Sequence, residues 1–322
     1  MKLAERLIVK AKEAGADIIK FQTYKAEKLV VKKSPRFWNW EGERKKSGTQ
    51  YDSYKNLDSF NKEQYQQLYK LCKKNNIEFM STPFDIEAVK MLNKIGMKGF
   101  KVASCDLNNY PLLEEIAKTN KPILLSTGAS NLSEIKKTVK FLEKKNVKKL
   151  CIMQCTLSYP TEKKDANLSV LLKFKKEFKK YLIGLSDHTL GVNVPISSVL
   201  LGSRVIEKHF TIDKKLKKSA DHWLSVNPKE LNQIRIGVDE LVSAYGNGVK
   251  KILKSEKKAR IFARRSIVAK STIFKNETLT KYNITQKRPG DGMEPSRVHE
   301  VLGKKAKKKF IVDEKISLKH LK

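Results

Sequence analysis

The chain has 322 residues, 40% of them hydrophobic, so it is long enough for one large domain with a substantial core and a smaller second domain. It carries 68 Lys and Arg against 34 Asp and Glu, a formal net charge of +34. No apolar run reaches the roughly 18 residues that a membrane-spanning helix needs, which excludes that class of protein.

The positive charge by itself does not predict a nucleic-acid partner. Most lysines occur as scattered pairs along helical stretches, such as 136–137, 144–145 and 175–176, and no aromatic ladder or recognition helix accompanies them. We interpret them as solvated helix faces. The four cysteines show no zinc-site spacing, and the first residues form an amphipathic pattern that carries Glu13 and Asp17, unlike a signal peptide. A cytoplasmic protein with reduced thiols is expected.

Along the chain, helical stretches alternate with strand-like runs. The strands are expected at 17–22, 78–83, 99–104, 122–128, 150–155, 181–185 and 204–208. Helices are expected at 3–14, 61–75, 85–95, 110–118, 132–144 with Ser133 as its cap, about 168–178 and 192–201. A long polar excursion at 23–60 is expected to be a functional or mobile loop.

Such alternation predicts an α/β fold with a parallel sheet, and a (β/α)8 TIM barrel fits the length. Only seven strands are found, so the first barrel strand, expected before the helix at 3–14, is predicted to be missing. The predicted domains are a barrel at 1–245, a basic linker at 246–258 and a small β-rich domain at 259–322.

Polar residues end most of these strands and are expected to meet at one rim of the barrel. They are Lys20, Gln22, Thr82, Lys101, Ser104, Ser126 and Ser186. A lysine inside a strand is costly unless it is paired, so Lys20 and Lys101 are the strongest signals. Lysines and hydroxyls converging on one centre predict a phosphate site.

Two histidines end neighbouring strands, His188 after 181–185 and His209 after 204–208. Each alone could be an ordinary surface histidine. Their paired placement favours a shared divalent metal, with water or carboxylate completing the shell.

At this point the residues resemble the sialic acid synthases, phosphoenolpyruvate-dependent enzymes with a barrel and a C-terminal antifreeze-like (SAF) domain. In the barrel the resemblance is carried by Lys-Phe-Gln (20–22), Ser-Thr-Pro-Phe-Asp (81–85), Lys-Val-Ala-Ser (101–104), Leu-Ser-Thr-Gly (125–128), Gln-Cys-Thr-Leu-Ser-Tyr-Pro-Thr (154–161), Gly-Leu-Ser-Asp-His-Thr (184–189), Ile-Glu-Lys-His-Phe-Thr (206–211) and Asp-His-Trp-Leu-Ser (221–225). In the second domain it is carried by 263–267 and 287–293.

The resemblance implies condensation of phosphoenolpyruvate with an open-chain N-acetylated amino sugar, N-acetylmannosamine or its 6-phosphate, giving a nonulosonate of the sialic type and phosphate. His188 and His209 would bind Mn²⁺, with Mg²⁺ or Co²⁺ possible. Phosphoenolpyruvate would be held by Lys20, Thr82, Lys101, Ser104, Ser126 and Ser186. The sugar would contact Gln22, Asp106, Tyr159, Asp221 and, across a homodimer with swapped SAF domains, Arg288. Lys101, Asp106, His188 and His209 would serve catalysis.

Three departures from the family pattern accompany the resemblance. The first strand is absent, Asp106 replaces a glutamate, and Leu157 with Ser158 stands where the family has Ser or Asn. Two alternatives stay open. One is a pseudaminic or legionaminic acid synthase that uses a 2,4-diacetamido sugar selected near Asp106 and at 37–40. The other is an inactive sugar-binding homologue, favoured by the missing strand.

Overall fold

The computed structural model describes residues 1–38, 48–58, 60–216 and 221–322 and divides into two compact units, Met1–Gly246 and Asn247–Lys322. The expected sugar-selecting stretch 37–40 falls partly on Asn39 and Trp40, which lie outside the described residues.

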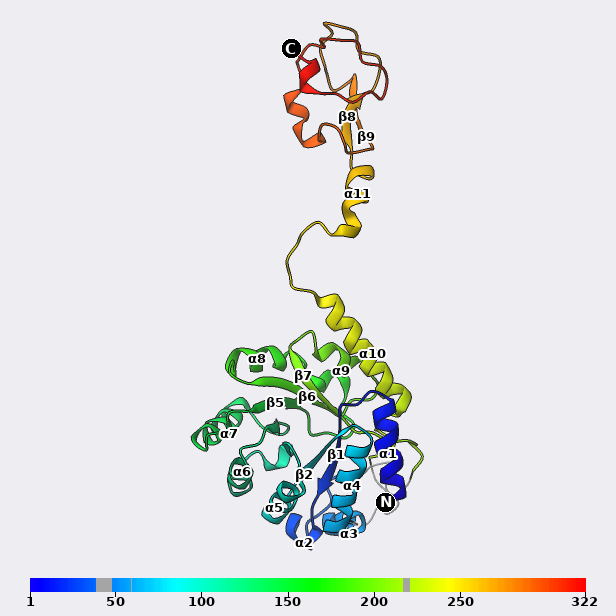
Figure 1. Cartoon of the computed structure of the whole chain (residues 1–322). Coiled ribbons are helices and arrows are strands. Elements are labelled where there is room, and N and C mark those ends of the chain that lie inside the picture. Colours follow the sequence, from blue (N-terminus) through cyan, green and yellow to red (C-terminus); the bar gives the residue numbers. More distant parts are fainter. Residues whose placement is uncertain (39–47, 59, 217–220) are drawn as a thin grey trace. The chain divides into compact units, whose positions relative to one another are not determined.

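Parallel strands form the centre of the first unit (Figure 1). They are β1 (Ile18–Thr23), β2 (Glu78–Pro83), β3 (Phe100–Val102), β4 (Ile123–Ser126), β5 (Leu150–Cys155), β6 (Leu182–Asp187) and β7 (Ser203–Lys208). β1 pairs with β2, while β3 to β7 form one sheet in chain order, and β2 lies against β3. The predicted α/β fold with a parallel central sheet is confirmed.

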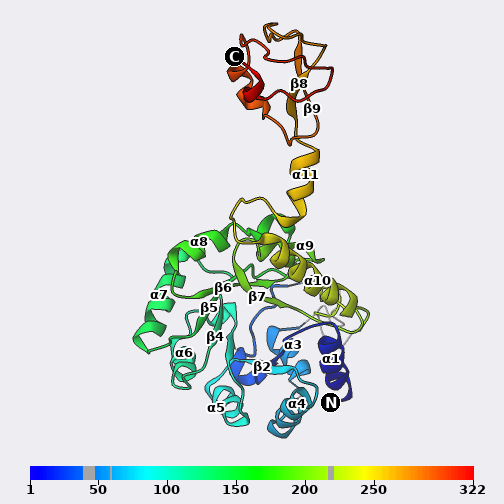
Figure 2. The ribbon, with the colours of Figure 1, turned by 45° about the horizontal axis from the view of Figure 1, so that its top comes forward.

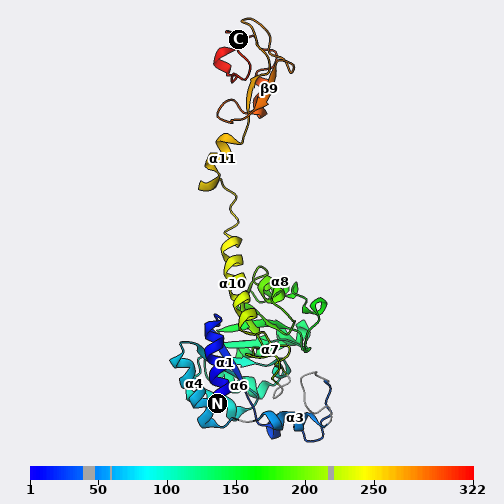
Figure 3. The same ribbon diagram turned by 90° about the vertical axis from the view of Figure 1, so that its right-hand side faces the viewer.

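Helices cover the outside of these strands (Figure 2). They are α1 (Lys2–Glu13), α2 (Ala26–Leu29), α3 (Gln50–Leu57), α4 (Lys62–Lys74), α5 (Ile86–Ile95), α6 (Tyr110–Ala117), α7 (Leu132–Lys144), α8 (Val170–Glu177), α9 (Asn193–Ser198) and α10 (Pro228–Tyr245). α1 and α10 lie side by side, although they are the first and last helices of the unit (Figure 3). The layer between helices and sheet is the hydrophobic core, with Phe79, Phe100 and Leu68 fully buried.

Two local expectations were wrong. The cap of α7 is Asn131, not Ser133: the Asn131 side chain accepts from the Glu134 backbone N–H, and the Glu134 side chain accepts from that of Asn131. This reciprocal pair satisfies two N–H groups that the helix start would otherwise leave open. The excursion at 23–60 is not simply a loop, because it contains α2 and α3, the latter capped by Thr49.

The ring of strands is interrupted between β7 and β1, which belong to different sheets. Within the described residues no ladder joins these two strands. A cavity of about 630 Å³ lies there instead, lined by both strands and by residues of α1 and α10. Lys20 and His209 are among its lining residues. In the part of the chain that the structure describes, the expected eight-stranded barrel is therefore not closed.

The second unit is small and has its own core around Ile267, Ile284 and Phe310. It contains α11 (Lys257–Phe262) and the antiparallel strands β8 (Ser266–Ala269) and β9 (Ile284–Lys287). α11 begins inside the segment predicted as a linker. Short 3-10 helices in the two units lie at Ser104–Asp106, Lys163–Ala166, Lys254–Glu256, Pro295–Glu300 and Leu318–His320. Among the described helices, none is long and apolar enough to cross a membrane.

Candidate active site

Polar side chains from neighbouring strands meet inside the sheet of the first unit. Lys20 Nζ on β1 lies 3.5 Å from Thr82 Oγ1 on β2, and Lys101 Nζ on β3 donates to Ser126 Oγ on β4 at 2.6 Å. Parallel strands present their carboxyl ends at the same edge, which is why residues so far apart in sequence converge. The structure thus brings together four of the six residues expected to hold phosphoenolpyruvate.

A carboxylate that the sequence analysis missed links the two lysines. Glu207 on β7 places Oε1 3.2 Å from Lys20 Nζ and Oε2 3.3 Å from Lys101 Nζ. Oε2 is buried and makes no hydrogen bond, so the contact with Lys101 is ionic. Burial opposes ionisation, but Lys101 and Lys20 outweigh it and lower the pKa of Glu207 to about 2. Glu207 could have been found from the sequence, because it is a charged residue inside a strand, the same feature that identified Lys20 and Lys101.

Lys101 is the most deeply buried cation of the group, with 4% of its side chain exposed. Its ammonium also donates to the Val102 carbonyl at 3.0 Å. Burial lowers the pKa of Lys101, and Glu207 acts against this shift. Two lysines sharing one carboxylate leave an excess of positive charge in a confined space, which suits a multiply charged anion.

The remaining two serines lie around a cysteine. Ser104 Oγ accepts from the Gly128 backbone N–H at 2.9 Å, and the Cys155 thiol interacts with both Ser104 and Ser186. Burial raises the pKa of Cys155. A thiol held in its protonated form is a poor nucleophile, so the burial of Cys155 does not favour a nucleophilic role. A side chain at Gly128 would place Cβ 2.8 Å from Ser104 Oγ, and this close approach requires glycine.

The two histidines lie together at the ends of β6 and β7. Their ring centroids are 5.3 Å apart, and the Tyr159 ring lies 4.1 Å from that of His188. His188 Nδ1 is 2.9 Å from the Thr156 carbonyl, so Nδ1 carries the proton and Nε2 keeps its lone pair. Burial, reinforced by His209, lowers the pKa of His188 to about 3.

The protonation state of His188 bears on whether the two histidines could bind a metal ion. A neutral imidazole with a free Nε2 lone pair and a carbonyl on Nδ1 is the form that binds transition metals. The described residues contain no cluster of three or more His, Cys, Asp or Glu around a common point. Asp221 Oδ2 lies 3.4 Å from His209 Nδ1. A metal at this pair would therefore be held by the two imidazoles, and oxygen ligands from water or substrate would have to complete its shell.

The expected sugar contacts are only partly assembled. Gln22 and Asp221 line the cavity between β1 and β7 together with His209. Asp106 lies in the 3-10 helix after β3, where its Oδ1 accepts from Asn109 Nδ2 at 2.9 Å and burial raises its pKa. Arg288 directly follows β9 in the second unit.

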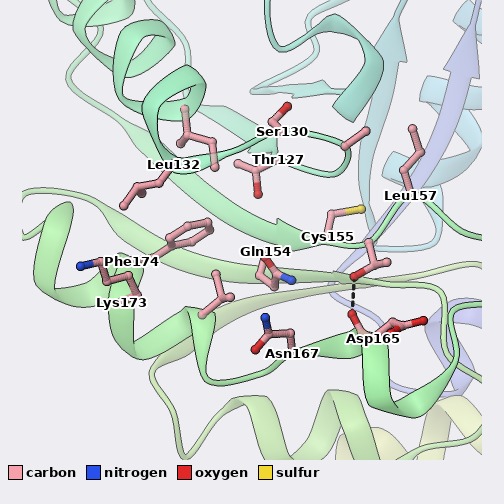
Figure 4. Close-up of a pocket in the computed structure, with 14 residues that line it drawn as sticks. Thr127, Ser130, Leu132, Gln154, Cys155, Leu157, Asp165, Asn167, Lys173 and Phe174 are labelled. Carbon is pink, nitrogen blue, oxygen red and sulfur yellow. Dashed lines mark hydrogen bonds between the residues drawn. The ribbon is translucent and has the colours of Figure 1, made fainter.

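A second cavity, of about 520 Å³, lies between the starts of α7 and α8 (Figure 4). Leu132 and Phe174 form apolar parts of its wall, and Thr127, Gln154 and Asn167 add polar groups. Among the described residues that line it, the charged side chains are Asp165 and Lys173, and Lys173 pairs with Glu177. It lacks the paired cations found inside the sheet, which favours the strand ends as the anion site.

Comparison with known proteins agrees with this arrangement. The NeuB family model matches residues 7–250. The chain is 38% identical to the N,N'-diacetyllegionaminic acid synthase of Campylobacter jejuni, covering 98% of this chain and 94% of that protein. It is 33% identical to the N-acetylneuraminate-9-phosphate synthase of Mus musculus, covering 94% and 84%. The crystal structure of N-acetylneuraminic acid synthetase from Leptospira borgpetersenii, in complex with citrate, superposes with a TM-score of 0.70 at 34% identity, covering 80% and 84%. The chain belongs to the NeuB family.

Proposed function

We propose that this protein is an enzyme that condenses phosphoenolpyruvate with an open-chain N-acetylated amino sugar to form a nonulosonate and phosphate. Relatives that align with almost the whole length of this chain are named as synthases of such acids. The observation that carries the proposal is the group of Lys20, Lys101 and the strand-end hydroxyls of Thr82 and Ser126, together with the pair of histidines at the ends of β6 and β7.

The reaction balances with one water. The enol carbon of phosphoenolpyruvate attacks the sugar aldehyde, whose oxygen takes a proton. Water adds to the carbon that bears phosphate and loses a proton, and the tetrahedral intermediate expels phosphate as the ketone forms. Two reactants and a water must be aligned, and this alignment supplies a large part of the acceleration.

In this reaction Lys20 and Lys101 would bind the phosphate and carboxylate of phosphoenolpyruvate. Thr82, Ser104, Ser126 and Ser186 would supply neutral hydrogen bonds. Charge moves towards the leaving phosphate as the bond breaks, and fixed ammonium groups stabilise that charge at little reorganisation cost. Lys101 is suited to this because Ser126 and Val102 already hold its ammonium in place.

His188 and His209 would hold a divalent metal, Mn²⁺ in the first instance and Mg²⁺ or Co²⁺ as alternatives. Bound there, the metal would supply a Lewis acid for the aldehyde oxygen. His188, fixed by the Thr156 carbonyl, would keep its lone pair available. Gln22, Asp106, Tyr159 and Asp221 would orient the sugar.

The second unit is proposed to be the SAF domain. Its Arg288 would reach the N-acetyl group of the sugar bound by a second copy of the chain, which makes a homodimer with swapped domains part of the proposal. All four cysteines are free, which supports a reducing, cytoplasmic setting.

The sugar itself has two candidates. N-Acetylmannosamine or its 6-phosphate follows from the sialic acid resemblance. A 2,4-diacetamido sugar is favoured by one observation: identity is higher to the legionaminic acid synthase, at 38%, than to the N-acetylneuraminate-9-phosphate synthase, at 33%. Asp106, with one methylene less than a glutamate, leaves extra room for a substituent at that point.

The test is phosphate release from phosphoenolpyruvate by the full chain, with each sugar in turn and with Mn²⁺ or a chelator. Sugar-dependent release with Mn²⁺ is expected, and the best sugar gives the specificity. If no sugar supports release while calorimetry still detects a bound sugar, the synthase proposal fails and a sugar-binding role replaces it. The opening between β7 and β1 is the structural observation that favours this second outcome.

A further inference from the structure

A buried ion pair joins the two strands that carry the histidines. Asp187 is the last residue of β6, Lys208 is the last residue of β7, and the two are partners in the parallel register. Lys208 Nζ lies 2.5 Å from Asp187 Oδ2, with side chains 5% and 2% exposed respectively. Few charged residues of a soluble protein are so completely removed from water.

The pair is also tied to the loop after β6. Asp187 Oδ1 accepts from the Thr189 backbone N–H at 2.9 Å, and Oδ2 accepts from Thr189 Oγ1 at 3.0 Å. Lys208 Nζ donates to the Thr189 carbonyl as well. Thr161 N donates to the His188 carbonyl at 3.0 Å, so His188 is held from the β5 side too. The backbone around His188 is therefore fixed from both directions.

Each partner of the ion pair directly precedes one histidine, Asp187 before His188 and Lys208 before His209. The ring centroids of those histidines are 5.3 Å apart. Any slip or splaying of β6 against β7 at this end would change the separation of the imidazoles. A close contact between the residues immediately before them limits both movements.

We propose that Asp187 and Lys208 are positioning residues that hold His188 and His209 at the separation needed to share one metal ion. The inference rests on the proposed function, because it takes the histidine pair as the metal site. Neither Asp187 nor Lys208 needs to touch metal or substrate for this role.

A purely stabilising role is a poor explanation for this pair. Removing two charges from water costs about as much as their mutual attraction returns, and apolar replacements of both partners are often neutral or stabilising. The positions of Thr189 and of the ends of β6 and β7 should respond differently from stability. They depend on directional contacts, which an apolar pair cannot make. Replacing both partners should therefore leave the stability nearly unchanged but weaken metal binding.

The test compares the full chain with Lys208→Met and with the double variant Asp187→Leu/Lys208→Met. The control is Glu114→Leu/Lys145→Met, which removes a 2.6 Å, partly exposed ion pair between α6 and the C-cap residue of α7. Thermal unfolding measures stability, and electron paramagnetic resonance measures the affinity for Mn²⁺ added alone. The single variant should be the least stable because it leaves Asp187 unpaired. The double variant should unfold close to the unmodified chain but bind Mn²⁺ about 10–100-fold more weakly, the usual effect of losing an outer partner of a metal ligand.

A second readout needs no metal. His188 is 7% exposed, so its reaction with diethyl pyrocarbonate should be slow in the unmodified chain and the control, and faster in the double variant. If the unmodified chain binds no Mn²⁺ yet His188 becomes reactive in the double variant, the metal proposal fails and the positioning role stands. Unchanged Mn²⁺ affinity together with unchanged His188 reactivity overturns the inference. Should the double variant not fold, Lys208→Arg replaces it, with the same two readouts and the same criteria.

Discussion

Replacing Lys101 by methionine should abolish most activity without a matching loss of stability. Methionine has nearly the length of lysine but no charge, so the packing around position 101 is largely kept. The ammonium that would hold phosphoenolpyruvate is lost. The contacts of Lys101 determine how large the changes in stability and in activity should be.

On stability, two acceptors lose a donor, Ser126 Oγ at 2.6 Å and the Val102 carbonyl at 3.0 Å, and Glu207 Oε2 loses an ionic partner at 3.3 Å. Each group left unpaired costs about 1–3 kcal/mol, although the Ser126 hydroxyl can rotate and Glu207 keeps Lys20. Against this, a charge that is 96% buried no longer has to leave water, which returns several kcal/mol. We expect a net change in unfolding free energy within about 2 kcal/mol.

On activity, a fixed donor facing a developing phosphate charge contributes about 10²–10³ in rate. Phosphate release by Lys101→Met should fall by about 100-fold or more, while the midpoint of urea unfolding moves little. Lys98→Met is the matched control, since its ammonium is on the surface and pairs with Glu78. It should change neither quantity. Near-normal turnover of Lys101→Met, or a loss of stability well above 2 kcal/mol, would refute the reasoning.

Three further outcomes follow from the same contacts. Glu207→Gln removes the carboxylate between two lysines, so inorganic phosphate should bind about tenfold more tightly by calorimetry, and weaker binding would contradict the assigned charge balance. Gly128→Ala brings Cβ to 2.8 Å from Ser104 Oγ, so it should raise the KM for phosphoenolpyruvate, and an unchanged KM would place Ser104 outside the site. Since the pKa of His188 is lowered to about 3, the unfolded chain binds the proton first as pH falls, and stability should drop between pH 6.5 and 3. His188→Gln should flatten that part of the urea-unfolding profile, and an identical profile would argue against a buried neutral imidazole.

Local patterns predicted the elements well where apolar periodicity was strong. The helix at 132–144 was expected at the residues where α7 is found. Its cap was missed because Ser133 is a common capping residue, although Asn131 followed three residues later by Glu134 was the better signal. The helices α2 and α3 were missed because short polar helices depend on contacts such as the Lys25–Asp58 ion pair, which joins their ends.

The same limit applies to the site. A lysine inside a strand was a sound signal for Lys20 and Lys101, because burying an ammonium is costly without a partner. The partner itself, Glu207, could not be assigned from sequence, since three strands far apart in the chain have to fold before the three charges meet. In the motif at 206–211 the sequence pattern predicts a role for His209 but none for Glu207.

The sequence alone therefore determined the α/β alternation, the strand-end lysines and hydroxyls, and the placement of the two histidines on successive strands, because each depends on spacing along the chain. Tertiary structure decided which charges face one another: Glu207 between two lysines, Asp187 against Lys208, and the opening between β7 and β1. Pairing between distant residues depends on strand register and sheet curvature, and neither is written in any local stretch of residues.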